Sequence, residues 1–123
     1  MSHRFVWVDI PVLDLERAIT FYEAVLASRV MREGGSGVPF AVLAHGGSDV
    51  AGCLVQASAD HAPSPNGPLV YLNVDGRIAD AERAAAANGG HVLQPSHPIG
   101  PHGYRAIVID SEGNRVALHS ATR

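Results

Sequence analysis

The sequence predicts an α+β fold built from two tandem βαβββ modules, and two observations support this fold class. The order strand, helix, strand, strand, strand occurs twice along the chain, with an offset of roughly 62 residues that marks an internal repeat. Each module alone has one sheet and one helix, so its second sheet face needs a partner, which the other module supplies. We expect one domain over residues 1–123, with module one at 1–56, a linker at 57–68 and module two at 69–123.

The elements of module one follow from its apolar spacing and its turn residues. Alternating apolar residues predict a first strand that Pro11 ends, and helical spacing predicts a helix over 15–27 with Asp14 as its N-cap. Glycine-rich turns separate the strands that follow. The four expected strands cover residues 4–10, 29–33, 38–44 and 50–56.

Module two repeats this order after a linker of small, polar and proline residues. Its alanine-rich helix, 78–87, is stopped by Asn88, Gly89 and Gly90. The segment 95–103, with its prolines, is expected to be a loop. The four expected strands cover residues 69–75, 91–94, 104–110 and 114–120.

Composition excludes several classes of function. The net charge is −3 and all nine basic residues are arginines that form no stripe, so nucleic acid is not an expected partner. No apolar run reaches the ~18 residues of a membrane helix, and the N-terminus has no secretory pattern, so a cytoplasmic protein is expected. The single cysteine, Cys53, excludes an internal disulfide and is expected to be a small buried residue rather than a nucleophile.

Strand alternation assigns each strand an aliphatic face, which suits packing under a helix, and a mixed aromatic and polar face. The mixed faces are expected to line a concave cleft, the usual form of a small-molecule site. The residues assigned to this cleft are Phe5, Trp7, Asp9, Leu69, Tyr71, Asn73, Arg105, Ile107, Ala117 and His119.

Arg105 and His119 lie on strands joined by the short turn 111–113, so they are expected within diagonal contact of each other. The arginine fork suits a carboxylate or phosphate, and an imidazole exchanges a proton near neutral pH. Together they are expected to anchor an anionic or carbonyl group. Two alternatives stay open: an ion pair of Asp9 with Arg4 or Arg105 at the rim, and a rim His119 satisfied by a backbone carbonyl.

Three stretches of the chain resemble the vicinal oxygen chelate superfamily, which includes glyoxalase I, extradiol dioxygenases and the bleomycin and fosfomycin resistance proteins. They are VLDLERAITFYEAVL at 12–26, AANGGHV at 86–92 and DSEGNRVALHS at 110–120. The resemblance covers nearly the whole chain, because both modules match. It implies that each module forms an open half-barrel around the cleft, and that two chains pair as a homodimer.

The resemblance also identifies where a metal would bind. Members usually hold one divalent metal with His, Gln or Glu ligands from the first and fourth strands of each module. The matching positions here are Trp7, Leu69, Ala117 and about Cys53 or Leu54, none of which is a usual His or Glu ligand. No metal is therefore expected there. An alternative is a non-standard three-histidine site formed by His97, His102 and His119.

Two functions are compatible with this cleft. The first is a metal-independent lyase or isomerase of the glyoxalase type, acting on a small carbonyl or carboxylate compound with His119 and Asp9 as catalytic residues. The second is a binding protein of the resistance type, which sequesters a flat compound between Trp7 and Tyr71 without chemistry. The expected ligand-binding residues are Trp7, Tyr71, Asn73, Arg105, Ile107 and His102.

Overall fold

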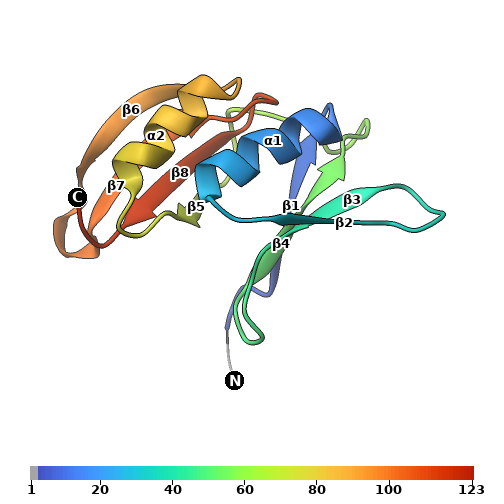
Figure 1. Ribbon diagram of the computed structural model, residues 1–123, viewed down its shortest axis with the longest axis horizontal. Helices are drawn as coiled ribbons and strands as arrows, with labels where there is room; N and C mark the ends of the chain where they lie inside the picture. The colour runs from blue at the N-terminus through green and yellow to red at the C-terminus, as the bar shows by residue number, and fades with distance from the viewer. Residues whose placement is uncertain (1–2) are drawn as a thin grey trace.

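The computed structural model describes residues 3–123. In it, each half of the chain folds into one four-stranded sheet with one helix packed against it (Figure 1). Module one contains β1 (Trp7–Val12), α1 (Leu15–Leu26), β2 (Val30–Glu33), β3 (Phe40–Leu43) and β4 (Ala51–Gln56). Module two contains β5 (Val70–Asn73), α2 (Ile78–Ala87), β6 (His91–Pro98), a 3₁₀ turn (Gly100–His102), β7 (Tyr104–Ile109) and β8 (Arg115–Ser120).

The two sheets have the same topology. Their strand orders are β1-β4-β3-β2 and β5-β8-β7-β6, and in each sheet the first and fourth strands of the module pair in parallel while the other pairs are antiparallel. Each sheet is an open half-barrel, and the predicted repeat of two βαβββ units is confirmed.

Several predicted strand boundaries are wrong. The first strand begins at Trp7 rather than at residue 4, and β5 covers Val70–Asn73 rather than 69–75. Two further differences involve proline. The first strand does not end at Pro11 but continues to Val12, because β1 pairs only with β4 and an edge strand does not need a donor on its free side. The expected loop at 95–103 begins as strand, since β6 runs on to Pro98. Its pairing with β7 has register shifts between Val92 and Gln94 and again before His97, and such bulges at a sheet edge accommodate prolines.

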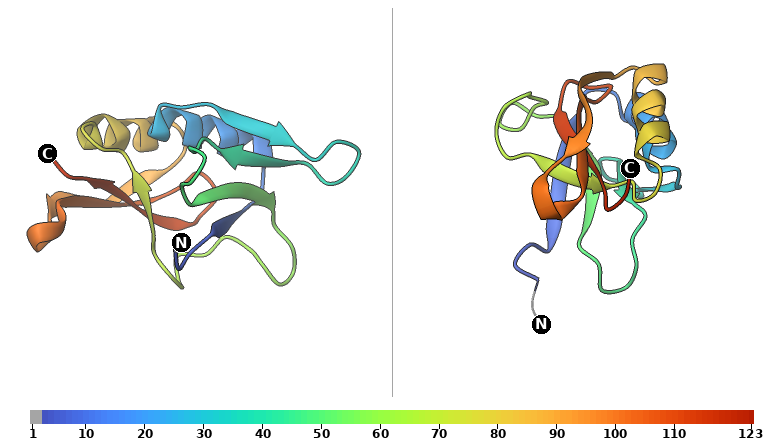
Figure 2. Two further views of the ribbon diagram at one scale, coloured as in Figure 1. Left: turned by 90° about the horizontal axis from the view of Figure 1, so that it is seen from below. Right: turned by 90° about the vertical axis from the view of Figure 1, so that its left-hand side faces the viewer.

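The core lies between the helices and the aliphatic faces of the sheets. The two helices lie side by side on one side of both sheets (Figures 1 and 2). Most of the aliphatic strand faces assigned from alternation are confirmed, since these residues are buried there: Ile10, Leu72, Val74, Ala106, Val108, Val116 and Leu118. Val8 and Val70 are partly buried against this core. The prediction is wrong for Val6, which precedes β1 and is 75 % exposed. Asp14 caps α1 as expected, because its side chain accepts a hydrogen bond of 3.1 Å from the Arg17 amide.

The turn between β7 and β8 fastens module two to module one. The Glu112 carboxylate accepts the backbone N–H groups of Leu13 and Asp14, at 2.8 Å each, and forms an ion pair of 2.7 Å with Arg17. Burial acts to raise the pKa of Glu112, but hydrogen bonds from Arg17, the two amides and Ser111 outweigh it and lower the pKa to about 2. The carboxylate is therefore ionised at neutral pH, and it accepts hydrogen bonds from the backbone N–H groups just before α1.

A second set of contacts in the same turn reaches the interior of module one. The buried Tyr22 hydroxyl donates to Asp110 Oδ2 at 2.6 Å, and Asn114 Nδ2 donates to the Pro11 carbonyl at 2.8 Å. Burial, with the Asp110 carboxylate as the next cause, raises the pKa of Tyr22 well above its usual value, so the hydroxyl remains a donor. The β7–β8 turn thus forms hydrogen bonds with the end of β1, with the start of α1 and with Tyr22 inside α1.

None of the helices between residues 3 and 123 combines the length and apolarity needed to cross a bilayer.

Candidate functional site

Each sheet has an open face, which we define as the surface turned away from the helices. The mixed residue sets assigned from strand alternation lie on these open faces where they fall within strands, whereas Phe5 and Leu69 precede β1 and β5. Trp7 and Tyr71 are 45 % and 46 % exposed there, while Ile107 and Ala117 are buried and form part of the floor in module two. A hollow of about 400 Å³ on module two is lined by Tyr71 and His119, among others. The candidate site is therefore an open surface rather than an enclosed chamber.

Four polar side chains form a row across the open face of module two. Strand pairing places His97 opposite Arg105, Arg105 opposite His119, and His119 opposite Asn73. We call these four residues the arginine row. Arg105 and His119 are thus direct cross-strand partners, closer than the diagonal contact expected from the turn.

Arg105 is held by neutral groups. Its Nη1 donates to the Tyr71 hydroxyl at 2.7 Å, and its Nε and Nη2 lie 3.3 and 3.2 Å from His97 Nε2. Within residues 3–123 the three ion pairs join Arg17 to Glu112, Arg32 to Glu16 and Arg83 to Asp80, so none involves Arg105. A half-buried guanidinium without a carboxylate partner is suited to an incoming anion.

Backbone carbonyls fix the tautomers of both neighbouring histidines. His97 Nδ1 lies 2.9 Å from the Pro95 carbonyl, and because a carbonyl only accepts, this nitrogen carries the proton and Nε2 accepts from Arg105. His119 Nε2 lies 2.5 Å from the His102 carbonyl, so in the neutral ring Nδ1 holds the free lone pair. The expectation that a backbone carbonyl satisfies His119 is met, and it leaves one ring nitrogen able to accept a proton.

Asp9 belongs to a separate cluster on the open face of module one. Its Oδ1 accepts the Trp7 indole N–H at 2.9 Å and lies 3.3 Å from Cys53 Sγ. The ion pair considered for Asp9 with Arg4 or Arg105 is absent from residues 3–123, because Asp9 is exposed and water stabilises its charge. Burial, followed by the hydrogen bond to Asp9, raises the pKa of the Cys53 thiol, which keeps it a protonated and unreactive group.

The structure therefore divides the residues expected to form one cleft. Tyr71, Arg105 and His119 come together on module two, whereas Trp7 and Asp9 lie on the other sheet and contact each other. Asn73 belongs to the row, but its Oδ1 accepts the Asp75 amide at 2.9 Å.

Two histidines, His97 in the row and His102 beside it, lie differently from their expected places. His102 contributes its backbone carbonyl, and its side chain is exposed at the 3₁₀ turn. His97 was expected in a loop, yet it is a strand residue and a direct partner of Arg105. Pro95 and Pro98, on either side of His97, favoured the prediction of a loop. The register shifts in the β6–β7 pairing bring the His97 side chain to the row.

The side chains present do not fit the metal centre that the fold class usually carries. At the four matching positions only Cys53 has a ligating atom, and its thiol is already bonded to Asp9. His97, His102 and His119 are not gathered around one point, and residues 3–123 contain no group of three His, Cys, Asp or Glu side chains arranged to hold a metal ion. Two of these imidazoles have one nitrogen committed to a backbone carbonyl.

Two half-barrel βαβββ modules with their open faces are the architecture of the vicinal oxygen chelate proteins. The family model described as the Glyoxalase/Bleomycin resistance protein/Dioxygenase superfamily matches residues 4–118, and the chain belongs to this superfamily. Proteins named "Putative glyoxylase CFP32" from Mycobacterium bovis and Mycobacterium tuberculosis are 31 % identical to it over 112 residues. That match covers 88 % of this chain, and the chain spans 40 % of the length of these relatives.

Solved structures share the fold at low sequence identity. A glyoxalase/bleomycin resistance protein from Albidiferax ferrireducens is 21 % identical with a TM-score of 0.72, covering 96 % of this chain and 98 % of that one. A fosfomycin resistance protein from Listeria monocytogenes, solved with Mn(II) and a dihydroxypropylphosphonic acid, is 13 % identical with a TM-score of 0.67, covering 100 % and 93 %. These similarities establish the architecture of this chain.

Proposed function

We propose that this protein binds a small organic anion, a carboxylate or a phosphonate, on the open face of module two with Arg105 as its anchor. The observation that supports this proposal is the environment of the guanidinium, which is oriented by the Tyr71 hydroxyl and by His97 Nε2 but has no carboxylate partner within residues 3–123. An arginine oriented in advance loses little entropy on binding, and its fork matches both oxygens of a carboxylate.

The neighbouring groups suit a flat ligand next to that anion. The Tyr71 ring is about half exposed, and its centroid lies 6.3 Å from that of the His119 ring, with the planes tilted by 56°. An aromatic or conjugated body placed over Tyr71 would bury apolar area while its acidic group meets Arg105. Trp7 belongs to the other open face and is not part of this proposed site.

Phenylpyruvate, which joins an aromatic ring to a ketone and a carboxylate, is a suitable first probe. We expect Arg105→Ala to weaken its binding in calorimetric titration by about 2 kcal/mol or more, with the melting temperature nearly unchanged. Arg83→Ala is the matched control, because Arg83 is an exposed arginine paired with Asp80 on α2. Unchanged affinity with lowered stability in Arg105→Ala would make Arg105 structural and refute the proposed anchor.

A second candidate function, a metal-independent lyase or isomerase acting on a small carbonyl or carboxylate compound, is favoured by the fixed tautomer of His119. In that reaction His119 Nδ1 would take a proton from the carbon next to the carbonyl, Arg105 would stabilise the charge that develops on oxygen, and the proton would return to a neighbouring atom. Asp9 has no part in this proposal, since it lies on the other sheet.

Hydrogen–deuterium exchange at the methylene carbon of phenylpyruvate separates the two functions. Enzymatic proton abstraction predicts exchange in D₂O, followed by proton NMR, that exceeds the uncatalysed rate and is lost in His119→Asn while binding persists. Binding without chemistry predicts the uncatalysed rate for both proteins.

A further inference from the structure

The two halves of the junction between the modules are not equivalent. On one side, the β7–β8 turn at 110–114 packs into module one through Asp110, Glu112 and Asn114. The corresponding β3–β4 turn at 45–50 makes its side-chain hydrogen bonds within itself: the Gly46 amide donates to Asp49 Oδ2 at 3.0 Å, and His45 Nδ1 to the Gly46 carbonyl at 2.8 Å. Among the described residues, this turn therefore makes no side-chain hydrogen bond to module two like those that the 110–114 turn makes to module one.

The strand pairing explains why this turn does not reach module two. β7 and β8 stay paired up to Ile109 opposite Arg115, directly at their turn. β3 and β4 are paired only as far as Val42 opposite Cys53, so the chain separates before the turn begins. The space left between the separated strands, the end of α1 and β5 is a cavity of about 640 Å³, which we call the junction cavity.

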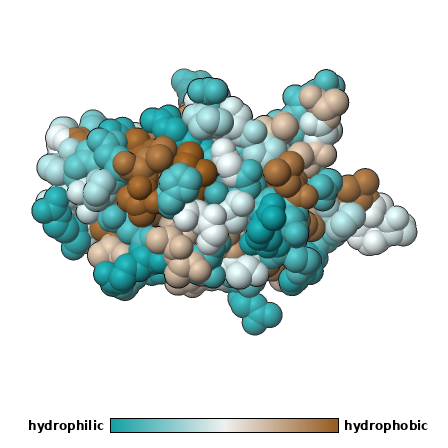
Figure 3. Space-filling view, turned by 90° about the horizontal axis from the view of Figure 1, so that it is seen from above, coloured by the Kyte–Doolittle hydropathy of each residue, from teal (hydrophilic) through white to brown (hydrophobic). Residues whose placement is uncertain are grey.

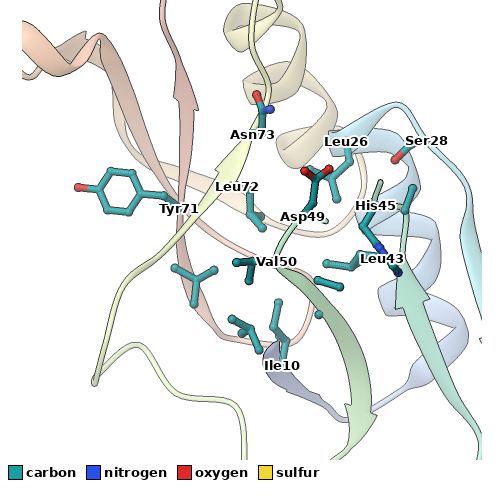
Figure 4. A pocket seen from close by; sticks show the side chains of 15 residues that line it. Ile10, Leu26, Ser28, Leu43, His45, Asp49, Val50, Tyr71, Leu72 and Asn73 are labelled. Carbon is teal, nitrogen blue, oxygen red and sulfur yellow. The ribbon is translucent and has the colours of Figure 1, made fainter. Parts of the chain in front are cut away.

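The junction cavity has an apolar interior and a polar rim. Its apolar lining comes from both modules and consists of Val8, Ile10, Leu26, Leu43, Val50, Val70 and Leu72. The polar side chains of Ser28, His45 and Asp49 are among the lining residues and are labelled in Figure 4. The volume lies in the range of small-molecule sites, which typically combine apolar walls with a few polar groups.

The junction cavity borders the arginine row along β5, where Tyr71 and Asn73 form part of its edge, but its lining does not include Arg105, His97 or His119. Along β5, the Leu72 side chain points into the cavity while the Tyr71 ring points away from it (Figure 4). The Tyr71 hydroxyl accepts instead from Arg105 in the neighbouring site. The two sites also differ in charge. The arginine row presents the Arg105 guanidinium, whereas the rim of the cavity presents the Asp49 carboxylate, and neither group forms an ion pair within residues 3–123.

We propose that the junction cavity is a second ligand site, which takes a small apolar molecule carrying one protonated amine. The hydrocarbon or aromatic body is buried between β1, β4 and β5, and the ammonium group meets Asp49 at the rim. His45 Nε2, the ring nitrogen not directed at the Gly46 carbonyl, and the Ser28 hydroxyl can accept further hydrogen bonds at the same edge.

Three matched probes test the class of ligand: 4-phenylbutylamine, 4-phenylbutan-1-ol and 4-phenylbutyrate, which share one apolar body and differ in charge. In ¹⁵N NMR titrations of the full chain, the amine is expected to shift the amide signals of residues 28, 45–52 and 70–72 and to bind most tightly. Asp49→Asn is expected to weaken the amine about fivefold and leave the alcohol unchanged, as for a partly exposed ion pair. Asp60→Asn, at another exposed aspartate, is the control.

A second experiment tests the location of the site by filling the cavity with a large side chain. Val50→Trp is expected to reduce the affinity for the amine at least tenfold, whereas Val38→Trp, at an exposed position outside the cavity, is expected to leave it unchanged. If Val50→Trp does not fold, Ala44→Trp fills the same space from an exposed position. The proposal is overturned if no probe shifts the cavity signals, if the butyrate binds there as tightly as the amine, or if filling the cavity changes the oligomeric mass instead of binding.

Discussion

At the scale of single residues, Glu112 joins the two modules through several polar contacts. Glu112 is buried, accepts two backbone amides and pairs with Arg17, so its charged form is stabilised only in the folded chain. A folded-state pKa near 2 against an ordinary value of 4.5 corresponds to about 3 kcal/mol of stability at neutral pH. Because the folded pKa is the lower one, this stability is complete above about pH 4.5 and is lost as the pH falls toward 2.

The variant Glu112→Gln tests this at the residue scale. We expect it to lower the free energy of unfolding by about 2–3 kcal/mol at pH 7, measured in urea, and the difference from the wild type to shrink steadily below pH 4.5. Glu16→Gln, which removes an exposed ion pair with Arg32, should change stability little at either pH. A difference for Glu112→Gln that stays constant down to pH 2 would contradict the assigned pKa.

At the scale of elements, the connection between α2 and β6 depends on the absence of a side chain at Gly90. A Cβ atom at this position would lie 2.3 Å from the Ile109 carbonyl oxygen and 2.7 Å from Phe21 Cε1. The chain therefore passes from α2 into β6 directly against the Ile109 carbonyl of β7 and the Phe21 ring of α1.

We expect Gly90→Ala to destabilise the protein by about 3 kcal/mol, because backbone and a buried ring must both move. Gly47→Ala is the control, since nothing lies within 4 Å of its added Cβ, and its stability should stay within about 0.5 kcal/mol of the wild type. Thermal unfolding followed by circular dichroism compares the two. Equal melting temperatures for Gly90→Ala and Gly47→Ala would contradict the prediction, because they would show that the α2–β6 connection accommodates a methyl group without loss of stability.

At the scale of the whole molecule, both open faces leave aromatic residues exposed. Phe5 is 78 % exposed on module one, and Trp7 and Tyr71 are each nearly half exposed. Apolar surface is also visible on the face of Figure 3, in one patch over the module-two half and in smaller patches toward the β2–β3 end. Exposed apolar area of this kind favours association between copies of the chain.

We accordingly predict a homodimer, with a mass by light scattering of about twice the 12.9 kDa of one chain at micromolar concentration. Trp7→Glu should shift the protein toward the monomer, because a carboxylate in an apolar contact is costly, while Val38→Glu at an exposed position of the β2–β3 hairpin should not. A wild-type mass of one chain would contradict the prediction.

Local patterns in the sequence determined the parts of this protein that depend on neighbours along the chain. Alternation with a period of two predicted the buried and open faces of the strands, and the short turn at 111–113 predicted that Arg105 and His119 meet. The repeat of strand and helix spacing predicted the two modules. The Asp14 cap and the helix at 78–87 were likewise readable from the residues present.

Only the tertiary structure decided how distant segments meet. Alternation assigned Asp9 and His119 to one cleft, yet in the structure each makes its contacts within its own module. How the two modules sit together depends on the junction contacts of Glu112, Asp110 and Asn114. His97 reaches Arg105 only through bulges that no periodicity reveals. The junction cavity likewise arises from a contact that one turn makes and the other does not. Such features depend on packing between residues far apart in the chain, whereas local patterns record only the environment of each segment.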